Sequence, residues 1–240
     1  MTFISAVYPS RGRLAGVKIA STTPSAPLVT YFPVRRSLVH QRWLYGSGEL
    51  TGRLAPHLTT AGVPVLISNS RGPASLADMV TELGDHAHAV TVAEAADADL
   101  VVLALPFVRV PELADTVIDW TGRIVVDATN QFAHYTPVYG GSVDLGEEIG
   151  SEWVARHLPA ATVIKAFNAM YATYLRPNPR HREGRQVVFH AGDDNTACGD
   201  FNQPIGGLGF APVRVGGLRE GGKLIQLEGP LNALHALKQD

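Results

Sequence analysis

Short apolar runs alternate with longer segments of mixed polarity from about residue 41 to the end of the chain. An alternation of strands and helices with this spacing is typical of a parallel sheet wrapped by helices. The runs predict strands at Gly62–Ser68, Ala87–Val90, Leu100–Leu105, Arg123–Ala128, Thr162–Ala166, Arg185–Ala191 and Ala211–Val215. The segments between them predict helices at Glu49–Ala61, Pro73–Leu83, Pro111–Trp120 and Glu147–Leu158.

Two of the runs have the composition of strands that are covered on both faces. Leu100–Leu105 is apolar throughout, and Arg123–Ala128 is apolar in its middle before it leads into a polar cluster that ends at Asn130. Buried strands of this kind belong to parallel sheets with helices on both sides. The predicted fold is therefore an α/β, Rossmann-type, doubly wound and mostly parallel sheet, whose ligands bind beyond the carboxyl ends of the strands.

Three segments fit this pattern less well. The run Val39–Tyr45, which should form the first strand, carries three polar residues where a central parallel strand is normally apolar. Asn195–Gly207 occupies a helix position but contains three glycines and a proline, which predicts that this helix is short. Gln131–Gly146 is rich in aromatic residues and glycine, and we interpret it as a long loop that covers a site.

Composition excludes several classes of protein. The chain has 240 residues, 45% hydrophobic residues, 18% charged residues and a formal net charge of −2, which are ordinary values for a globular domain that binds neither nucleic acid nor an acidic membrane. A single cysteine, Cys198, rules out an internal disulfide and a multi-cysteine metal site. No apolar run approaches the roughly 20 residues of a membrane span. We expect a soluble, cytoplasmic protein.

The first 40 residues differ from the rest of the chain. No acidic residue occurs before Glu49, while arginines are frequent and Ser21–Pro27 is rich in serine, threonine and proline. This composition is also found in transit peptides, but the prolines prevent a convincing amphipathic helix. We interpret residues 1–40 as a poorly ordered tail, or as a stretch upstream of the natural start.

A glycine-rich turn follows the expected first strand. The first glycine of such a turn allows a tight bend, the second lets the backbone approach a pyrophosphate, and the following helix offers free N–H groups to the phosphates. Thr51 stands where a third glycine is usual and adds a β-branched side chain at the contact between helix and strand. Taken alone, the turn could be an ordinary loop. The candidate phosphate-binding residues are Gly46, Ser47, Gly48, Glu49, Leu50 and Thr51.

The end of the second expected strand predicts which nucleotide binds. An acidic residue about 20 residues beyond the glycine turn normally holds the ribose 2′-hydroxyl of NAD, whereas arginine suits the 2′-phosphate of NADP. Here the strand ends in Asn69, Ser70 and Arg71, and no Asp or Glu occurs between Thr51 and Ala77. These donors can meet phosphate oxygens through charge-assisted hydrogen bonds. They are also good turn residues, so a solvated turn is the alternative.

The other reactive side chains give little indication of metal binding or catalysis. His86 and His88 lie on one face of a short strand without a third ligand nearby, so we predict no metal site. His134 and Tyr135, in the long loop, could shield or protonate a substrate. Cys198 has no neighbouring His or Lys and is expected to be inert. A Gly-x-Ser-x-Gly motif is absent.

With these residues in view, the chain resembles the F420-dependent NADP oxidoreductase family. The resemblance rests on seven motifs, six of which fall in order at the expected strand ends: Gly46–Gly48, Ser68–Pro73, Leu105–Phe107, Asp119–Asn130, Val163–Asn168, Ala191–Asp194 and Leu208–Val213. It implies an NADP-binding Rossmann domain at residues 41–166 and a small C-terminal part at 167–240 that closes a cleft over the nicotinamide. Family members often pair through this part, which implies a possible homodimer through Lys223–Leu237.

The resemblance also implies residues near the nicotinamide. Leu105, Pro106 and Phe107 would lie along its ribose, although simple packing at a strand end is the alternative. Asn130, Ala166 and Asn168 would anchor the carboxamide, which needs one donor and one acceptor; the asparagines could instead cap a helix or turn. No residue is identified as catalytic.

The expected function is hydride transfer between NADP(H) and a small-molecule acceptor or donor. The resemblance favours a deazaflavin, F420, because direct exchange between two redox rings needs proximity rather than a general acid. The alternatives are reduction of a small imine, flavin or ferric acceptor, or a non-catalytic NADP sensor. Thr51 and the polar first strand favour the sensor.

Overall fold

The computed structural model describes residues 3–4, 42–45, 49–95, 97–117, 119–134, 140–175 and 178–239. Its strands are β1 (Phe3–Ile4), β2 (Arg42–Tyr45), β3 (Val65–Ser68), β4 (Ala87–Ala89), β5 (Leu100–Leu103), β6 (Ile124–Asp127), β7 (Phe132–His134), β8 (Gly140–Ser142), β9 (Thr162–Ala166), β10 (Arg180–His181), β11 (Gly184–Gly192), β12 (Ala211–Arg214) and β13 (Leu237–Lys238). Its α-helices are α1 (Glu49–Thr60), α2 (Ala77–Leu83), α3 (Val92–Ala95), α4 (Val110–Thr116), α5 (Gly150–His157), α6 (Asn195–Gly207) and α7 (Leu218–Ile225). Short 3-10 helices lie at Pro73–Leu76, Phe107–Arg109 and Ala172–Tyr174.

The centre of the sheet is parallel and has the strand order of a dinucleotide-binding fold. Strand β2 pairs in parallel with both β3 and β5, and the parallel pairing continues from β3 to β4 and from β5 through β6 to β9. The resulting order, β4-β3-β2-β5-β6-β9, reverses direction of growth at β2, which is the switch point where Rossmann folds bind ligands. The two-residue strand β1 pairs antiparallel with β2 and β3. The predicted fold class is confirmed.

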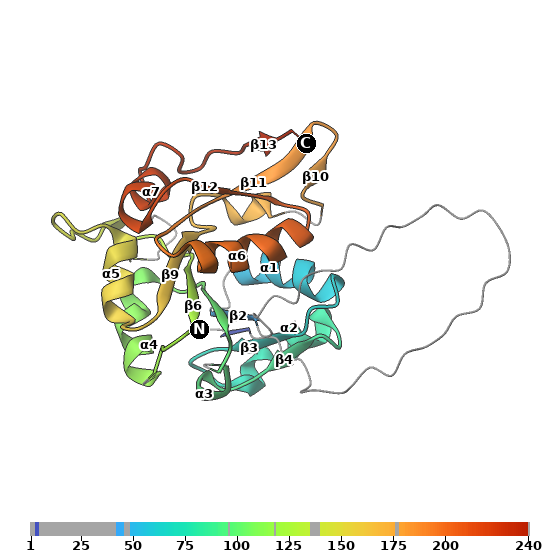
Figure 1. The fold of residues 1–240 in the computed structure, drawn as a ribbon. Coiled ribbons are helices and arrows are strands. Elements are labelled where there is room, and N and C mark those ends of the chain that lie inside the picture. The colour runs from blue at the N-terminus through green and yellow to red at the C-terminus, as the bar shows by residue number, and fades with distance from the viewer. Residues whose placement is uncertain are drawn as a thin grey trace, which may run out of the picture.

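Helices cover both faces of the sheet (Figure 1). On one face, alternate strand residues such as Val102 and Val126 pack with apolar residues of α1 and α6. On the other, Val101 and Val125 pack with residues of α4 and α5. This alternation explains why β5 is apolar throughout and why β6 is apolar up to its last residue, Asp127: each apolar side chain enters one of two cores.

The sheet continues beyond the parallel strands. Strand β11 runs antiparallel to β9, and β10, β12 and β13 all pair with β11. The segment after residue 166 therefore extends the same sheet.

The structure corrects two expectations about local structure. Helix α6 is not short, because it covers the whole of Asn195–Gly207. The Asp194 carboxylate caps it by accepting the Ala197 N–H at 2.8 Å, and Ala197, Phe201 and Ile205 bury one face, which outweighs the poor propensity of its glycines. The segment Gln131–Gly146 is not all loop, since β7 and β8 pair antiparallel within it.

The remaining boundaries differ less from expectation. Strand β2 forms at Arg42–Tyr45 and contains one of the three polar residues, Arg42; the other two, His40 and Gln41, lie outside the described residues. The helix predicted at Pro73–Leu83 is divided into a 3-10 turn and α2, and α4 ends at Thr116, before Trp120. Within the described residues, no helix is long and apolar enough to cross a membrane.

A buried histidine predicts acid sensitivity of the fold. His190 lies in β11 with no exposed surface, and its ring is 5.1 Å from the Phe201 ring. Burial, helped by repulsion from Arg214, lowers the pKa of His190 from 6.5 to about 4. The unfolded chain therefore takes up a proton that the folded chain excludes, so stability is complete above the unfolded pKa and falls as the pH drops towards 4.

We expect the free energy of unfolding to be roughly 2 kcal/mol lower at about pH 5 than at about pH 8 on account of this one residue. Urea denaturation at the two pH values checks this. The difference should shrink by that amount in His190→Leu and persist in His88→Leu, which changes an exposed histidine. An unchanged difference in His190→Leu would contradict the assignment.

Candidate functional site

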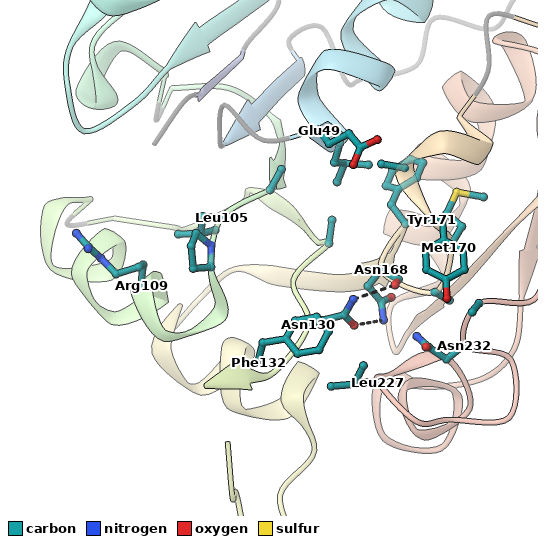
Figure 2. Close-up of a pocket in the computed structure, with 18 of the residues that line it drawn as sticks. Glu49, Leu105, Arg109, Asn130, Phe132, Asn168, Met170, Tyr171, Leu227 and Asn232 are labelled. Carbon is teal, nitrogen blue, oxygen red and sulfur yellow. Dashed lines mark hydrogen bonds between the residues drawn. The ribbon is translucent and has the colours of Figure 1, made fainter. Parts of the chain in front are cut away.

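A cavity of about 790 Å³ opens at the carboxyl ends of the parallel strands (Figure 2). Strands β5, β6 and β9 supply one wall through the segments that directly follow them, and the segments around Tyr171 and Asn232 supply the opposite wall. The lining residues are Glu49, Leu50, Ser70, Ala104, Leu105, Pro106, Arg109, Ala128, Asn130, Phe132, Phe167, Asn168, Ala169, Met170, Tyr171, Ala172, Leu227, Asn232 and Ala233. Its size is within the usual range for a ligand site.

A second hollow of about 440 Å³ shares Ser70 with the first. It lies between the turn after β3, the start of α3 and one side of α4. The residues around it are Asn69, Ser70, Gly72, Pro73, Thr91, Val92, Ala93, Glu112, Leu113 and Thr116. Together the two hollows form an elongated site across the switch point of the sheet.

The turn after β3 is held by Asn69. Its side chain is buried, accepts the Arg71 backbone N–H at 2.8 Å through Oδ1, and donates from Nδ2 to the Ser75 hydroxyl at 2.7 Å. Gly72 has a φ of 84°, which favours glycine. Asn69 therefore shapes the turn through its side chain. Ser70 lines both hollows, whereas the exposed Arg71 next to it is not among the lining residues.

Charges near this turn come from more than one part of the chain. The absence of acids from Thr51 to Ala77 suggested a site with no carboxylate, but α4 brings Glu112 to the edge of the second hollow. Glu112 forms an ion pair with Arg109, which lines the larger cavity. The pairing offsets the negative charge that Glu112 would otherwise present to a phosphate.

Two asparagines meet at the centre of the cavity, as Figure 2 shows. Asn130 Nδ2 donates to the Asn168 backbone carbonyl at 3.1 Å, and Asn168 Nδ2 donates to Asn130 Oδ1 at 3.2 Å and to the Ile225 carbonyl at 2.6 Å. Asn168 Oδ1 is buried and accepts no hydrogen bond from a described residue. The preceding residue, Phe167, has a φ of 66°, a left-handed conformation that is strained for a non-glycine residue.

An ion pair lies directly beneath these asparagines. Lys165 Nζ is 2.8 Å from Asp127 Oδ2, and the two side chains are 1% and 0% exposed. The Thr129 backbone N–H and hydroxyl donate to Asp127 Oδ1 at 2.9 and 2.6 Å, and Lys165 also donates to the Thr129 carbonyl. The sequence analysis did not select this pair. A charged residue near the end of each of two apolar strands was the signal for it.

The other candidate residues separate into lining and packing positions. Glu49, Leu50, Leu105 and Pro106 line the cavity. Thr51 is fully buried, as expected for a residue at the contact between helix and strand.

Phe107 and Ala166 do not line the cavity. Both are fully buried, and the Phe107 ring packs against Trp153 with ring centroids 4.2 Å apart. The expectation that the Phe107 ring lies along a ribose is therefore wrong, because its side chain belongs to the core under α5.

Several sequence candidates lie elsewhere. Gly46, Ser47, Gly48 and Tyr135, and the side chain of His134, lie outside the described residues. Burial raises the pKa of the Cys198 thiol, which makes it a poor nucleophile. In the part of the chain that the structure describes, no three His, Cys, Asp or Glu side chains are grouped to hold a metal ion.

The opposite wall was missed by the sequence analysis. Met170, Tyr171, Leu227, Asn232 and Ala233 come from two segments of the C-terminal part. The Ala233 N–H donates to the Ala169 carbonyl at 2.7 Å, which fastens the two segments to each other. No motif marks these residues, and only the folded chain brings them together.

Comparison with known proteins identifies the family. The fold matches a hypothetical protein of Sinorhizobium meliloti with a TM-score of 0.76 and 38% identity, over 82% of this chain and 94% of that one. Residues 44–131 match the family model described as NADP oxidoreductase, coenzyme F420-dependent. The chain belongs to the F420-dependent NADP oxidoreductase family. This is a family of NAD(P)-dependent oxidoreductases.

Two further relatives show how widely this fold is used. A protein of Arthrobacter sp. FB24 assigned as an F420-dependent NADP-reductase matches with a TM-score of 0.61 and 24% identity, over 73% of this chain and 84% of that one, which shows the shared fold. Metalloreductase STEAP3 of Rattus norvegicus is 28% identical over 177 residues, which is 73% of this chain. The chain spans about a third of the length of that relative (33%).

Proposed function

We propose that this protein transfers hydride between NADP(H) and a second redox molecule, and that this molecule is a deazaflavin of the F420 type. The observation that carries the proposal is the elongated site itself. Two hollows that share Ser70 lie across the switch point. Ser70 and the neighbouring Arg71 offer phosphate-binding groups at one end, and at the other end Asn168 Oδ1 is a buried acceptor without a partner among the described residues.

The residues present fit NADP. Helix α1 begins at Glu49 on the cavity edge, so the free N–H groups and positive dipole of its first turn can hold the pyrophosphate. Ser70 and Arg71 would hold the 2′-phosphate. Asn168 Oδ1 would accept from the nicotinamide carboxamide, whose N–H group supplies the missing donor. When bound, NADPH supplies the hydride from its nicotinamide ring.

The lining supports an acceptor that needs no proton donor from the protein. Among the described lining residues the ionisable side chains are Glu49, Arg109 and Tyr171, and all three are exposed. Apolar residues of the cavity, including Phe132, Met170 and Leu227, exclude water around the place where two rings would stack. A deazaflavin suits this environment because its ring system delocalises the charge that the hydride brings.

A ferric or flavin acceptor is the second candidate. The likeness to Metalloreductase STEAP3 favours it, because that relative is named as a reductase of metals. The exposed Tyr171, which is 60% accessible, leaves the cavity mouth open to a bulky acceptor.

The test is NADPH binding by calorimetry, followed by loss of nicotinamide absorbance with F420, FMN, FAD, ferric citrate and a cyclic imine in parallel. Oxidation with F420 supports the proposal. Oxidation only with flavin or ferric citrate would support the second candidate, and oxidation only with the imine would require a proton donor and contradict both. Tight binding without oxidation would instead indicate an NADP sensor. An absence of NADPH binding would overturn the proposal altogether.

A further inference from the structure

The buried ion pair occupies the place in the sheet from which both cavity asparagines project. Asp127 and Lys165 face each other in the parallel register of β6 and β9, at the last position of β6 and the last but one of β9. Asn130 follows Asp127 by three residues, and Asn168 follows Lys165 by three. One electrostatic contact therefore joins the two strand ends that carry the cavity carboxamides.

Stability alone does not account for a buried ion pair. Removing two charges from water costs so much free energy that well-packed apolar residues of similar size often replace such a pair without loss of stability. Every neighbouring position of β6 is occupied by an apolar residue in the core, so an apolar pair would match the surroundings. The hydrogen bonds that Asp127 and Lys165 form give a better explanation of why the pair is present.

Those hydrogen bonds converge on one residue. The Thr129 backbone N–H and hydroxyl donate to Asp127, and the Thr129 carbonyl accepts from Lys165. Thr129 is 1% exposed and directly precedes Asn130. Both the N–H and the carbonyl of Thr129 are therefore held by hydrogen bonds. This fixes the direction in which the chain leaves β6 and the position of Asn130.

The second strand end is fixed in the same way. Lys165 anchors the end of β9, and the strained φ of Phe167 then turns Asn168 towards Asn130. The contacts between the asparagines are long, at 3.1 and 3.2 Å, so a small shift between the two strands would break them. A buried contact of 2.8 Å just beneath them limits such a shift.

We propose that Lys165 and Asp127 are positioning residues, which hold the Asn130 and Asn168 carboxamides in register to receive the nicotinamide half of NADPH. They touch neither cofactor nor acceptor, and they act through Thr129 and the two strand ends. This inference rests on the proposed function. It attributes the preference of the site for a nicotinamide to the Asp127–Lys165 ion pair, which lies beneath the two asparagines.

The test compares two ligands that share the adenosine half. Under the proposed function, adenosine 2′,5′-bisphosphate would contact the Ser70–Arg71 end and the first turn of α1, whereas NADPH would also reach the asparagines. The dissociation constant of the bisphosphate divided by that of NADPH therefore measures how much the nicotinamide half adds to binding. In the double variant Asp127→Leu/Lys165→Met we expect this ratio to fall at least tenfold, while the bisphosphate binds within about twofold of wild type.

The matched control is the double swap Val126→Ile/Ile164→Val, in the next register position of the same two strands. It conserves volume and should leave the ratio within about twofold of wild type. If the charged-pair variant does not fold, Asp127→Asn keeps the shape and weakens the ion pair, and the ratio should still fall several-fold.

The outcomes separate the two proposals. A folded charged-pair variant with an unchanged ratio would show that the pair only supports the sheet, and the inference would fail. A wild-type protein that binds both ligands equally would also overturn it. A wild type that binds neither ligand would overturn the proposed function itself.

Discussion

The Arg71→Ala variant is expected to bind NADPH about 30-fold more weakly than the wild type, while its affinity for NADH stays the same within about twofold. A guanidinium–phosphate hydrogen bond contributes about 2 kcal/mol, and NADH has no phosphate at that position. Arg71 is exposed and directly follows Ser70, the residue that lines both hollows, and the contact of its backbone N–H with Asn69 Oδ1 at 2.8 Å fixes the turn.

Calorimetric titration with both nucleotides checks this expectation. Arg182→Ala is the control, because it removes the same charge from a side chain that is 93% exposed, outside both hollows. It should leave both affinities unchanged. Equal losses for NADPH and NADH in Arg71→Ala would mean that this arginine supports the turn and does not select the 2′-phosphate.

The Gly221→Ala variant is expected to lower the free energy of unfolding by about 3 kcal/mol. Gly221 is buried in α7, where an added Cβ would lie 2.8 Å from Ala191 Cβ and 2.9 Å from the Gly216 backbone nitrogen. Neither neighbour can swing away, so α7 has to move off β11. Since Asn168 Nδ2 donates to the Ile225 carbonyl at the end of α7, the same movement should weaken NADPH binding.

Urea denaturation measures this effect, and Gly199→Ala provides a matched control. Gly199 is exposed in the middle of α6, and an added Cβ would meet nothing within 4 Å. That variant should be more stable than wild type by roughly 0.5–1 kcal/mol, because alanine loses less entropy than glycine in a helix. If Gly221→Ala were as stable as wild type, the tight contact between α7 and β11 would be refuted.

The sequence predicted the parallel core well, for a physical reason. Strands such as β5 and β6 are buried on both faces, so their continuous apolar runs differ from every surface segment. Helix α6 was mispredicted because only the poor helix propensity of Gly199, Pro204, Gly206 and Gly207 was considered. The buried stripe through Phe201 decides the outcome, and its value depends on a sheet that forms elsewhere in the chain.

The candidate site was predicted in part. Ser70, Leu105, Pro106, Asn130 and Asn168 line one cavity, because carboxyl ends of parallel strands meet at one edge of the sheet. Residue spacing alone did not reveal three features of the site, because they depend on tertiary contacts or on local turn geometry. These are the C-terminal wall, the Arg109–Glu112 ion pair and the hydrogen bond between Asn69 and Ser75.

The composition of the far wall affects how such a protein can evolve. Residues from 169–172 and 227–233 build this wall, and both stretches belong to the C-terminal part of the chain. These stretches are separate in sequence from Ser70 and Arg71, where the proposed function places the 2′-phosphate. We therefore expect chimeras that exchange them between relatives to change the redox partner and to keep the coenzyme preference of each parent.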